Sequence, residues 1–272
     1  MAAERIGVGV GAVGRVIAVV NQKGGVGKTT TAVNLAASFA VSERRTLLVD
    51  IDPQANSTSA YRIESPRHIY DALIGRCVIK DVTSATELRF LEVVPSGRDL
   101  YGAEIELVSA PRREHRLKSL LEGAREQYAI TLIDCPPSLG LLTLNALTAA
   151  DGVIIPLQCE YYALEGLAAL LETVALVRGE LNPSLEIDGV LLTMADNRNR
   201  LSRQVEAEAR SHLGDQVFET VIPRNVRLSE APSHGKPVLL YAAHSRGATA
   251  YLALAEEILR RDSHPTHGGT DE

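Results

Sequence analysis

The sequence has 272 residues, of which 45% are hydrophobic and 23% are charged, and its formal net charge at pH 7 is −6. This length fits one large α/β domain or two small ones, and it buries enough surface to fold without disulfides. The acidic balance argues against a wholly basic nucleic-acid binder, and no apolar run approaches the length of a membrane span. The composition therefore predicts a soluble globular protein.

Three cysteines are too few for a disulfide framework, so we expect a reducing, cytoplasmic environment. Residues 1–14 are apolar but interrupted by glycines, and no small-residue cleavage site follows them, so we interpret them as a flexible leader rather than a signal peptide. The polar residues 262–272 predict a disordered tail. Residues 15–261 are expected to form a single domain.

Short apolar runs alternate with helical stretches along the chain. Several runs are continuously apolar, which is typical of strands buried on both faces. We therefore predict an α/β fold of a single domain, with a mostly parallel twisted sheet and helices on both faces. The predicted strands are Val16–Val20, Thr46–Val49, Leu91–Val94, Ile130–Ile133, Val153–Ile155, Val190–Leu192 and Val221–Ile222. The predicted helices are Thr29–Ser42, Pro111–Gln127, Tyr161–Arg178 and Ser245–Arg261.

A glycine-rich loop follows the first predicted strand, with the sequence Asn-Gln-Lys-Gly-Gly-Val-Gly-Lys-Thr-Thr-Thr at residues 21–31. Glycines at such a place let backbone N–H groups turn toward phosphates, and the helix that follows presents its positive end to the anion. Lys28 is placed to reach the β- and γ-phosphates, and the hydroxyl of Thr29 is placed to ligate Mg²⁺. The predicted nucleotide-binding residues of this P-loop are Lys23, Gly24, Gly25, Val26, Gly27, Lys28, Thr29 and Thr30.

The loop departs from the strict P-loop pattern because Gln22 stands where the first glycine belongs. Lys23 is an additional lysine at the start of the loop, and from there it points away from its own phosphate cradle. The nucleotide of a second subunit would give this lysine a role.

Aspartates follow two of the predicted strands, in the sequences Val-Asp-Ile-Asp-Pro-Gln at 49–54 and Ile-Asp-Cys-Pro-Pro at 133–137. Phosphoryl transfer needs one carboxylate that holds Mg²⁺ or its waters and another that orients the attacking water. Asp134 fits the first role and Asp52 the second. Either aspartate alone could cap a turn, but two beside a P-loop favour a chemical role. The predicted catalytic residues are Lys23, Lys28 and Asp52, and the predicted metal ligands are Thr29, Asp52 and Asp134.

These motifs together resemble the deviant Walker A ATPases. Two further segments, Gln-Cys-Glu-Tyr-Tyr-Ala-Leu-Glu-Gly at 158–166 and Val-Ile-Pro-Arg-Asn-Val-Arg-Leu-Ser-Glu-Ala-Pro at 221–232, resemble one branch of that family, the chromosomal ParA or Soj proteins. The resemblance runs from about Arg15 to Arg261. One departure is Ala55, which stands where many members have glycine.

The resemblance implies an ATP-dependent switch for segregating chromosomes or plasmids. ATP and Mg²⁺ would be the cofactors, and ATP would close a homodimer in which Lys23 reaches the phosphates of the partner subunit. This dimer would bind double-stranded DNA without sequence preference, and a centromere-binding protein of the ParB/Spo0J type would stimulate hydrolysis. By motif position, Met194, Pro223 and Asn225 would line the adenine pocket, and Arg198 and Arg227 would contact DNA. The expected location is the cytoplasm, on the nucleoid.

Two other classes of protein share this nucleotide core. A membrane-associated spatial regulator of the MinD type would carry a basic amphipathic helix at its C-terminus, whereas the sequence here ends in a polar segment. An ATP-dependent iron–sulfur reductase would hold its cluster through cysteines, and Cys135 and Cys159 are the candidates, although they lack a recognised cluster spacing. ATP-dependent ligases also share the P-loop, but segments 158–166 and 221–232 argue against them.

Overall fold

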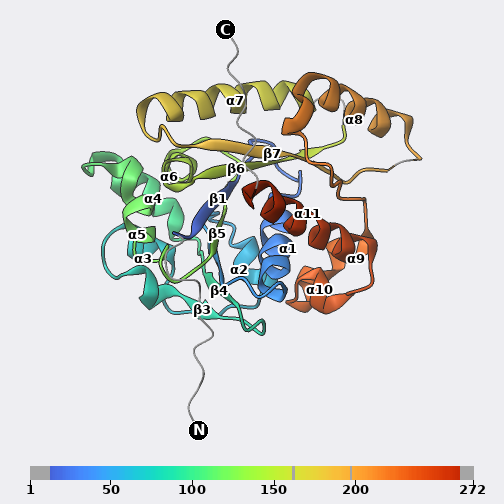
Figure 1. Ribbon diagram of the computed structural model, residues 1–272. Coiled ribbons are helices and arrows are strands. Elements are labelled where there is room, and N and C mark those ends of the chain that lie inside the picture. The colour runs from blue at the N-terminus through green and yellow to red at the C-terminus, as the bar shows by residue number, and fades with distance from the viewer. Residues whose placement is uncertain (1–12, 161–162, 197, 264–272) are drawn as a thin grey trace.

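The computed structural model describes residues 13–160, 163–196 and 198–263. Its centre is a sheet with the strand order β3-β4-β2-β5-β1-β6-β7, in which every pairing is parallel except that of β3 with β4 (Figure 1). The strands are β1 (Arg15–Val19), β2 (Thr46–Asp50), β3 (Ser84–Ala85), β4 (Leu91–Val94), β5 (Ile130–Asp134), β6 (Gly152–Gln158) and β7 (Glu186–Thr193). The single mostly parallel α/β domain is as predicted.

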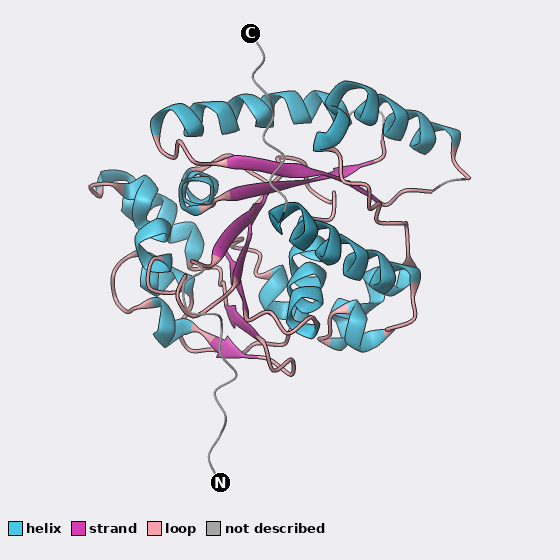
Figure 2. Ribbon diagram, in the orientation of Figure 1, coloured by secondary structure: helices cyan, strands magenta, loops and turns pink. Residues whose placement is uncertain are grey.

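Helices cover both faces of the sheet (Figure 2). The α-helices are α1 (Lys28–Val41), α2 (Asn56–Ala60), α3 (Ile69–Leu73), α4 (Leu100–Glu106), α5 (Arg116–Leu121), α6 (Leu141–Ala149), α7 (Ala163–Glu180), α8 (Arg200–Leu213), α9 (Val226–Glu230), α10 (Val238–Tyr241) and α11 (Arg246–Ser263). Short 3-10 helices are η1 (Ile79–Val82), η2 (Leu107–Ser109), η3 (Arg113–His115), η4 (Gly214–Gln216) and η5 (Ala231–His234).

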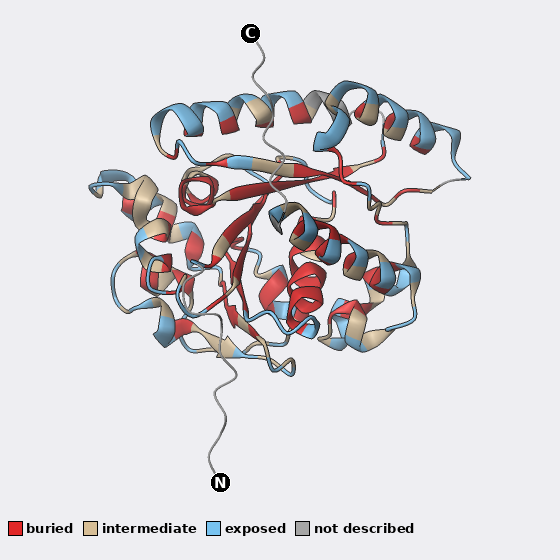
Figure 3. Cartoon of the chain, in the orientation of Figure 1, coloured by how far each residue is buried: buried red, intermediate tan, exposed pale blue. Residues whose placement is uncertain are grey.

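Alternate residues of the central strand β1 pack into two separate hydrophobic cores, one on each face of the sheet. Val16 and Ala18 pack with α3 to α8 on one face, and Ile17 and Val19 pack with α1, α2 and α9 to α11 on the other. The inner strands and most of α1 are buried, whereas the edge strand β3, the start of β7 and the outer sides of the covering helices are more exposed (Figure 3). Burial on both faces explains why the strands are continuously apolar in sequence.

Two predicted elements are wrong. Residues 221–222 do not form a strand. The pairing in this region is a single isolated bridge between the next residue, Pro223, and Ala195. The predicted helix Pro111–Gln127 breaks into η3, α5 and turns, and its apolar positions Leu117 and Leu121 are buried within the short α5. The sequence reasoning also missed the two-residue edge strand β3, which is too short to produce a periodic pattern.

Contacts to the rest of the protein occur near both ends of the part of the chain that the structure describes. The Gly14 backbone N–H, at the end of the predicted leader, donates to the Arg125 carbonyl at 2.8 Å, while residues 1–12 lie outside the described residues. Helix α11 continues to Ser263, two residues into the predicted tail, and Asp262 pairs there with Arg15. Residues 264–272 lie outside the described residues, so the disordered tail stays a prediction.

Candidate functional site

The glycine-rich loop lies between the end of β1 and the start of α1, as its sequence predicts. Gly25 and Gly27 have φ values of 77° and 92°, in the left-handed region that favours glycine. Gly27 is the N-cap residue of α1, a helix of 14 residues. The loop therefore ends at a helix N-terminus, where free N–H groups and the helix dipole favour an anion.

Hydrogen bonds from neighbouring strands hold the loop in shape. The Thr193 hydroxyl, at the end of β7, donates to the Val26 carbonyl at 2.8 Å. The Asn21 side-chain amide donates to the Pro156 carbonyl in β6 at 2.7 Å, and the Asn21 side-chain oxygen accepts from the Lys23 backbone N–H at 2.9 Å. The loop is thus braced by the sheet before any ligand is bound, which lowers the entropic cost of binding.

The two lysines of the loop occupy different environments. Lys28 is buried, and its Nζ donates to the Lys23 carbonyl at 3.0 Å. Burial lowers the pKa of Lys28, and the nearby Asp134 carboxyl opposes this shift. The Lys23 side chain is 43% exposed, and its Nζ lies 3.2 Å from Oε2 of Glu160, in the segment after β6. Lys28 therefore faces its own site, whereas Lys23 lies at the surface.

Asp134 is fully buried at the end of β5. Its Oδ2 accepts from the Ser57 hydroxyl at 2.8 Å, and its Oδ1 has no hydrogen-bond partner among the residues that the structure describes. Burial raises the pKa of Asp134, and the hydroxyls of Ser57 and Thr29 oppose the shift. A buried carboxylate oxygen without a partner is costly, so this atom fits a metal ion or a metal-bound water.

Asp52 lies two residues beyond β2, and its carboxylate borders a cleft. Its Oδ1 accepts from the Gln54 backbone N–H at 2.9 Å, and its Oδ2 accepts no hydrogen bond from the described residues. The backbone around it is strained at Ala55, where φ is 54°. This left-handed conformation gives a physical reason for the glycine that many members of the family have at that position.

Asp50 is a site residue to which the sequence reasoning gave no role. It pairs in register with Asp134 across β2 and β5, and its Oδ2 accepts from the backbone N–H and the hydroxyl of Thr58 at 2.9 and 2.8 Å. Its Oδ1 accepts from the Asp52 backbone N–H at 3.1 Å. Burial, followed by repulsion from Asp134, raises the pKa of Asp50. The sequence signal that could have identified Asp50 was its position at the end of a buried strand, two residues before Asp52.

A cleft of about 420 Å³ opens beside the loop, and most of the residues predicted to bind nucleotide or to act in catalysis line it. The predicted residues that line it are Gly24, Gly25, Gly27, Lys28, Thr29, Thr30, Asp52 and Met194. The predicted residues outside its lining are Lys23, Val26, Asp134, Pro223 and Asn225. Lining residues that the sequence reasoning missed include Asn34, Gln54, Pro137, Pro232 and Lys236. Gln54, Pro137 and Pro232 lie in motif segments in which other residues drew attention, whereas Asn34 and Lys236 lie outside every motif.

A family model described as an AAA domain matches residues 14–187 of the chain. The sporulation initiation inhibitor protein Soj of Bacillus subtilis (strain 168) is 57% identical over 90% of this chain and 98% of its own length. The chromosome partitioning protein ParA of Myxococcus xanthus (strain DK1622) is 56% identical over 92% of this chain and 90% of its own length. The chain belongs to the ParA/Soj family.

A solved structure outside the partitioning proteins shows how widely the ParA/Soj fold is shared. Cobyrinic acid a,c-diamide synthase from Mycobacterium smegmatis, with a bound ATP analogue and magnesium, superposes with a TM-score of 0.82. It is 36% identical to this chain, and the match covers 93% of this chain and 97% of that one.

The adenine residues expected of a ParA/Soj protein lie close together after β7. Met194 follows the last residue of β7, and the Ala195 carbonyl accepts from the Arg224 N–H at 3.0 Å. The bridge between Ala195 and Pro223 therefore places Pro223 beside Met194 along the backbone. The Asn225 side chain instead accepts from the Arg227 N–H at 2.9 Å and caps α9.

The two arginines expected at DNA are exposed, and each has an acidic partner. The Arg198 side chain is 93% exposed, and its Nε lies 3.2 Å from Oδ1 of Asp196. The Arg227 side chain is 56% exposed, and its Nη1 lies 2.7 Å from Oε2 of Glu230. Exposed ion pairs are weak, so a phosphate group can displace either carboxylate.

The cysteines of the iron–sulfur alternative are poor ligands. Cys135 and Cys159 are both buried, and burial raises the pKa of each thiol. Cluster ligation needs thiolates, which this environment disfavours. Within the described part of the chain, no group of three or more histidine, cysteine or acidic residues is placed to hold a metal ion.

Proposed function

We propose that the chain is an ATP-dependent switch that partitions DNA, with ATP and Mg²⁺ as its cofactors. In the ATP-bound state two copies form a homodimer that binds double-stranded DNA without sequence preference. A ParB-type partner then stimulates hydrolysis and release. The names of the two relatives, a ParA and a Soj protein that align over at least nine tenths of their length, support the partitioning role.

The cleft has the parts that bind a nucleoside triphosphate. Gly24, Gly25 and Gly27 bring the backbone against the phosphates, and Lys28 supplies the cation at the same wall of the cleft. The Thr29 hydroxyl and the unpartnered Oδ1 of Asp134 fit Mg²⁺ or its bound waters. Bound Mg²⁺ would neutralise charge on the phosphate oxygens.

Asp52 is the residue that we assign to the attacking water. Its Oδ1 is fixed by Gln54, while its Oδ2 is available to accept a hydrogen bond within the cleft. A carboxylate so placed orients the water and holds its proton without forming a covalent bond. Asp50, which accepts from the Asp52 N–H and does not line the cleft, is assigned the positioning of this loop.

The placement of Lys23 is the observation that carries the proposal. Its side chain lies outside the lining of its own cleft and is 43% exposed, and a carboxylate, Glu160, is the partner of its ammonium group. A lysine in a phosphate loop that does not face the cleft of its own subunit is positioned to meet phosphates on another subunit. Dimerisation through a two-fold axis would use both copies of Lys23 in the same way.

DNA binding is assigned to the exposed arginines Arg198 and Arg227, after β7 and in α9. Each subunit contributes few cations, so a monomer would bind DNA weakly. A dimer would contact twice as many DNA phosphates at once, so ATP would control DNA affinity through dimerisation. None of the described helices is long and apolar enough to cross a membrane. We propose a cytoplasmic protein located on the nucleoid, without stable membrane association.

The proposal is tested by measuring molar mass and DNA binding with Mg-ATP and with Mg-ADP. Light scattering after size exclusion should show a dimer only with Mg-ATP. Binding to a long duplex of any sequence should be tighter with Mg-ATP. A monomer in both nucleotides, or equal DNA affinity in both, would refute the switch.

A further inference from the structure

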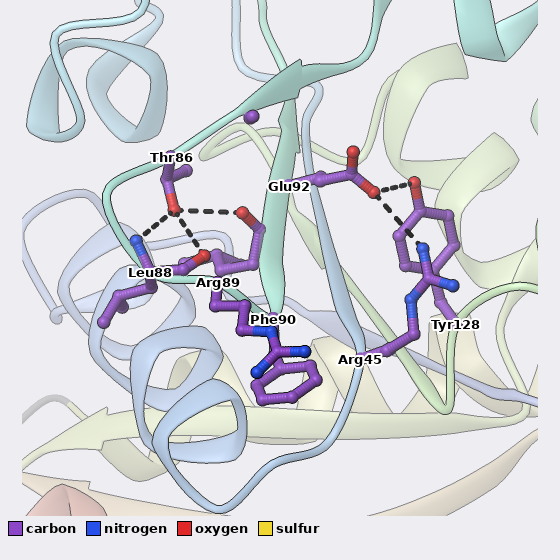
Figure 4. Close-up of a pocket in the computed structure, with 9 residues that line it drawn as sticks. Arg45, Thr86, Leu88, Arg89, Phe90, Glu92 and Tyr128 are labelled. Atoms are coloured by element: carbon purple, nitrogen blue, oxygen red, sulfur yellow. Dashed lines mark hydrogen bonds and ion pairs between the residues drawn. The ribbon is translucent and has the colours of Figure 1, made fainter. Parts of the chain in front are cut away.

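A second pocket lies at the amino ends of β2, β4 and β5, and it shares no lining residue with the nucleotide cleft. It has a volume of about 260 Å³. We call it the hairpin pocket, because the turn between β3 and β4 forms one of its walls. Its polar and aromatic lining residues are Arg45, Thr86, Arg89, Phe90, Glu92 and Tyr128 (Figure 4).

The pocket holds two guanidinium groups and one carboxylate. Arg45 lies over the Tyr128 ring with its Cζ 5.7 Å from the ring centroid, and Arg89 lies over the Phe90 ring at 5.1 Å (Figure 4). The Arg45 Nη2 is 4.0 Å from Oε2 of Glu92, which is a long ion pair. That oxygen also accepts from the Tyr128 hydroxyl at the much shorter distance of 2.6 Å.

The cationic charge of the pocket is therefore only partly neutralised. Arg89 has no ion pair or hydrogen bond among the residues that the structure describes, and its nearest ring partner is the neighbouring Phe90. Glu92 is the one acidic side chain in the pocket lining, its recorded ion pair is with Arg45, and the Tyr128 hydroxyl already donates to the same oxygen. Arginine donates bidentate hydrogen bonds to planar or tetrahedral anions, so two such groups at one pocket favour an anionic ligand.

The walls of the pocket are held by the backbone. The Phe90 carbonyl accepts from the Thr46 N–H at 2.8 Å, and the Arg45 carbonyl accepts from the Ala129 N–H at 2.8 Å. The Thr86 hydroxyl donates to the Leu91 carbonyl at 2.9 Å and closes the turn. The arginines thus project from a fixed frame, which reduces the entropic cost of binding.

We propose that the hairpin pocket binds a small organic anion, one that places a carboxylate or phosphate group between Arg45 and Arg89 and an apolar body against Phe90. The volume is below that of pockets for drug-sized ligands, which begin at about 300 Å³, so the ligand is small. This site is separate from the nucleotide cleft and does not depend on the partitioning function.

Calorimetric titration with benzoate and with phenyl phosphate tests the site and distinguishes the two anionic groups. Saturating Mg-ADP in the cell keeps phenyl phosphate out of the nucleotide cleft. The wild-type protein should bind at least one probe saturably, and the probe that binds more tightly identifies the group. Repeating the titration with Lys28→Ala, which lacks the phosphate-binding lysine of the cleft, should give the same affinity and keeps this result independent of the proposed function.

Single substitutions then locate the probe. Arg45→Gln and Arg89→Gln should each weaken binding about tenfold, the loss expected for one charge-assisted hydrogen bond. Arg44→Gln is the matched control, because Arg44 is exposed beside Arg45 but does not line the pocket, and it should bind as wild type. All three arginines are exposed, so the variants should fold. No saturable binding of either probe to the wild type, or unchanged binding in both pocket variants, overturns the proposal.

Discussion

The buried ammonium group of Lys28 donates a hydrogen bond to the backbone carbonyl of Lys23, five residues earlier in the same loop, at 3.0 Å. The backbone of the loop thus provides a hydrogen-bond acceptor for the buried ammonium group of Lys28. A phosphate oxygen is a charged acceptor and forms a stronger hydrogen bond than a neutral carbonyl, so a ligand phosphate would displace this contact. The loop is therefore held in a binding shape by an interaction that a ligand can replace.

Lys28→Ala should abolish the rise in melting temperature that Mg-ATP produces. A ligand that binds only the native state stabilises it by RT ln(1 + [L]/Kd), and the variant lacks the cation that meets the phosphates, so its Kd for ATP should rise. A thermal melt with and without Mg-ATP measures this, with Lys80→Ala as the control. An unchanged shift in Lys28→Ala would show that the cleft assignment is wrong.

Lys23→Ala should keep nucleotide binding but lose the ATP-induced dimer. The substitution removes a surface cation that lies outside its own cleft, so its cost should appear only where two subunits meet. Light scattering after size exclusion gives the molar mass, and the melting shift with Mg-ATP reports nucleotide binding in the same sample. If Lys23→Ala forms a dimer at the same ATP concentration as the wild-type protein, Lys23 has no role across the interface.

Asp52→Ala should bind ATP and accumulate the dimer, because no carboxylate then orients the attacking water. Removal of a group that acts on the nucleophile commonly lowers the rate by about 10² to 10⁴. Phosphate release under single-turnover conditions measures the chemical step. Glu64→Ala, which removes an exposed carboxylate outside the cleft lining, serves as the control. Hydrolysis by Asp52→Ala at the wild-type rate would exclude the assignment.

Arg198→Glu and Arg227→Glu should each weaken binding to all duplex sequences and leave ATP-driven dimerisation intact. Each phosphate contact contributes about 0.9 to the slope of log affinity against log salt, so both variants should show a flatter slope. Arg178→Glu, an exposed arginine on α7, is the charge-matched control. Wild-type binding by both Arg198→Glu and Arg227→Glu would place the DNA interface elsewhere.

The buried Asp188 should make stability depend on pH. Burial raises the pKa of Asp188 to about 6, although Arg15 pairs with it at 2.5 Å and opposes the shift. The folded-state pKa is above the unfolded value of about 4, so the native state binds more protons between those values. The free energy of unfolding should therefore fall as pH rises from about 4 to 6, by about 3 kcal/mol at most, and then level off.

Urea denaturation at several pH values checks this dependence, and Asp188→Asn should flatten it. Asp262→Asn removes the surface carboxylate that also pairs with Arg15, so it should leave the slope in place. An equal slope in Asp188→Asn and wild type would show that Asp188 ionises as an ordinary carboxyl in the folded protein.

The phosphate loop and the sheet were predictable because their signals are local. Strands buried on both faces are continuously apolar, and Gly25 and Gly27 stand where the backbone requires positive φ. Asp50 was harder to predict, because Asp134, with which it pairs in register, lies on another strand, and its hydrogen bond from the Asp52 backbone N–H forms only in the folded turn. Lining residues such as Lys236 come from distant segments that carry no motif.

The segment at 221–222 was misread because a short apolar run does not distinguish a strand from a loop that packs on the core. Ile222 is buried, and its carbonyl accepts from the Ala195 N–H at 3.1 Å, but the pairing around Pro223 remains a single isolated bridge and not a ladder. Proline has no backbone N–H, so it cannot extend the pairing.

The hydroxyl of Thr193 connects two parts of the proposed switch. It donates to the Val26 carbonyl in the phosphate loop, and Arg198 lies only five residues further along the chain. Thermodynamic linkage makes any such coupling reciprocal: the factor by which ATP tightens the hold on DNA is the factor by which DNA tightens the hold on ATP. A copy of the protein on the nucleoid would therefore bind ATP with higher affinity than a free copy, and the chromosome itself would act as an effector.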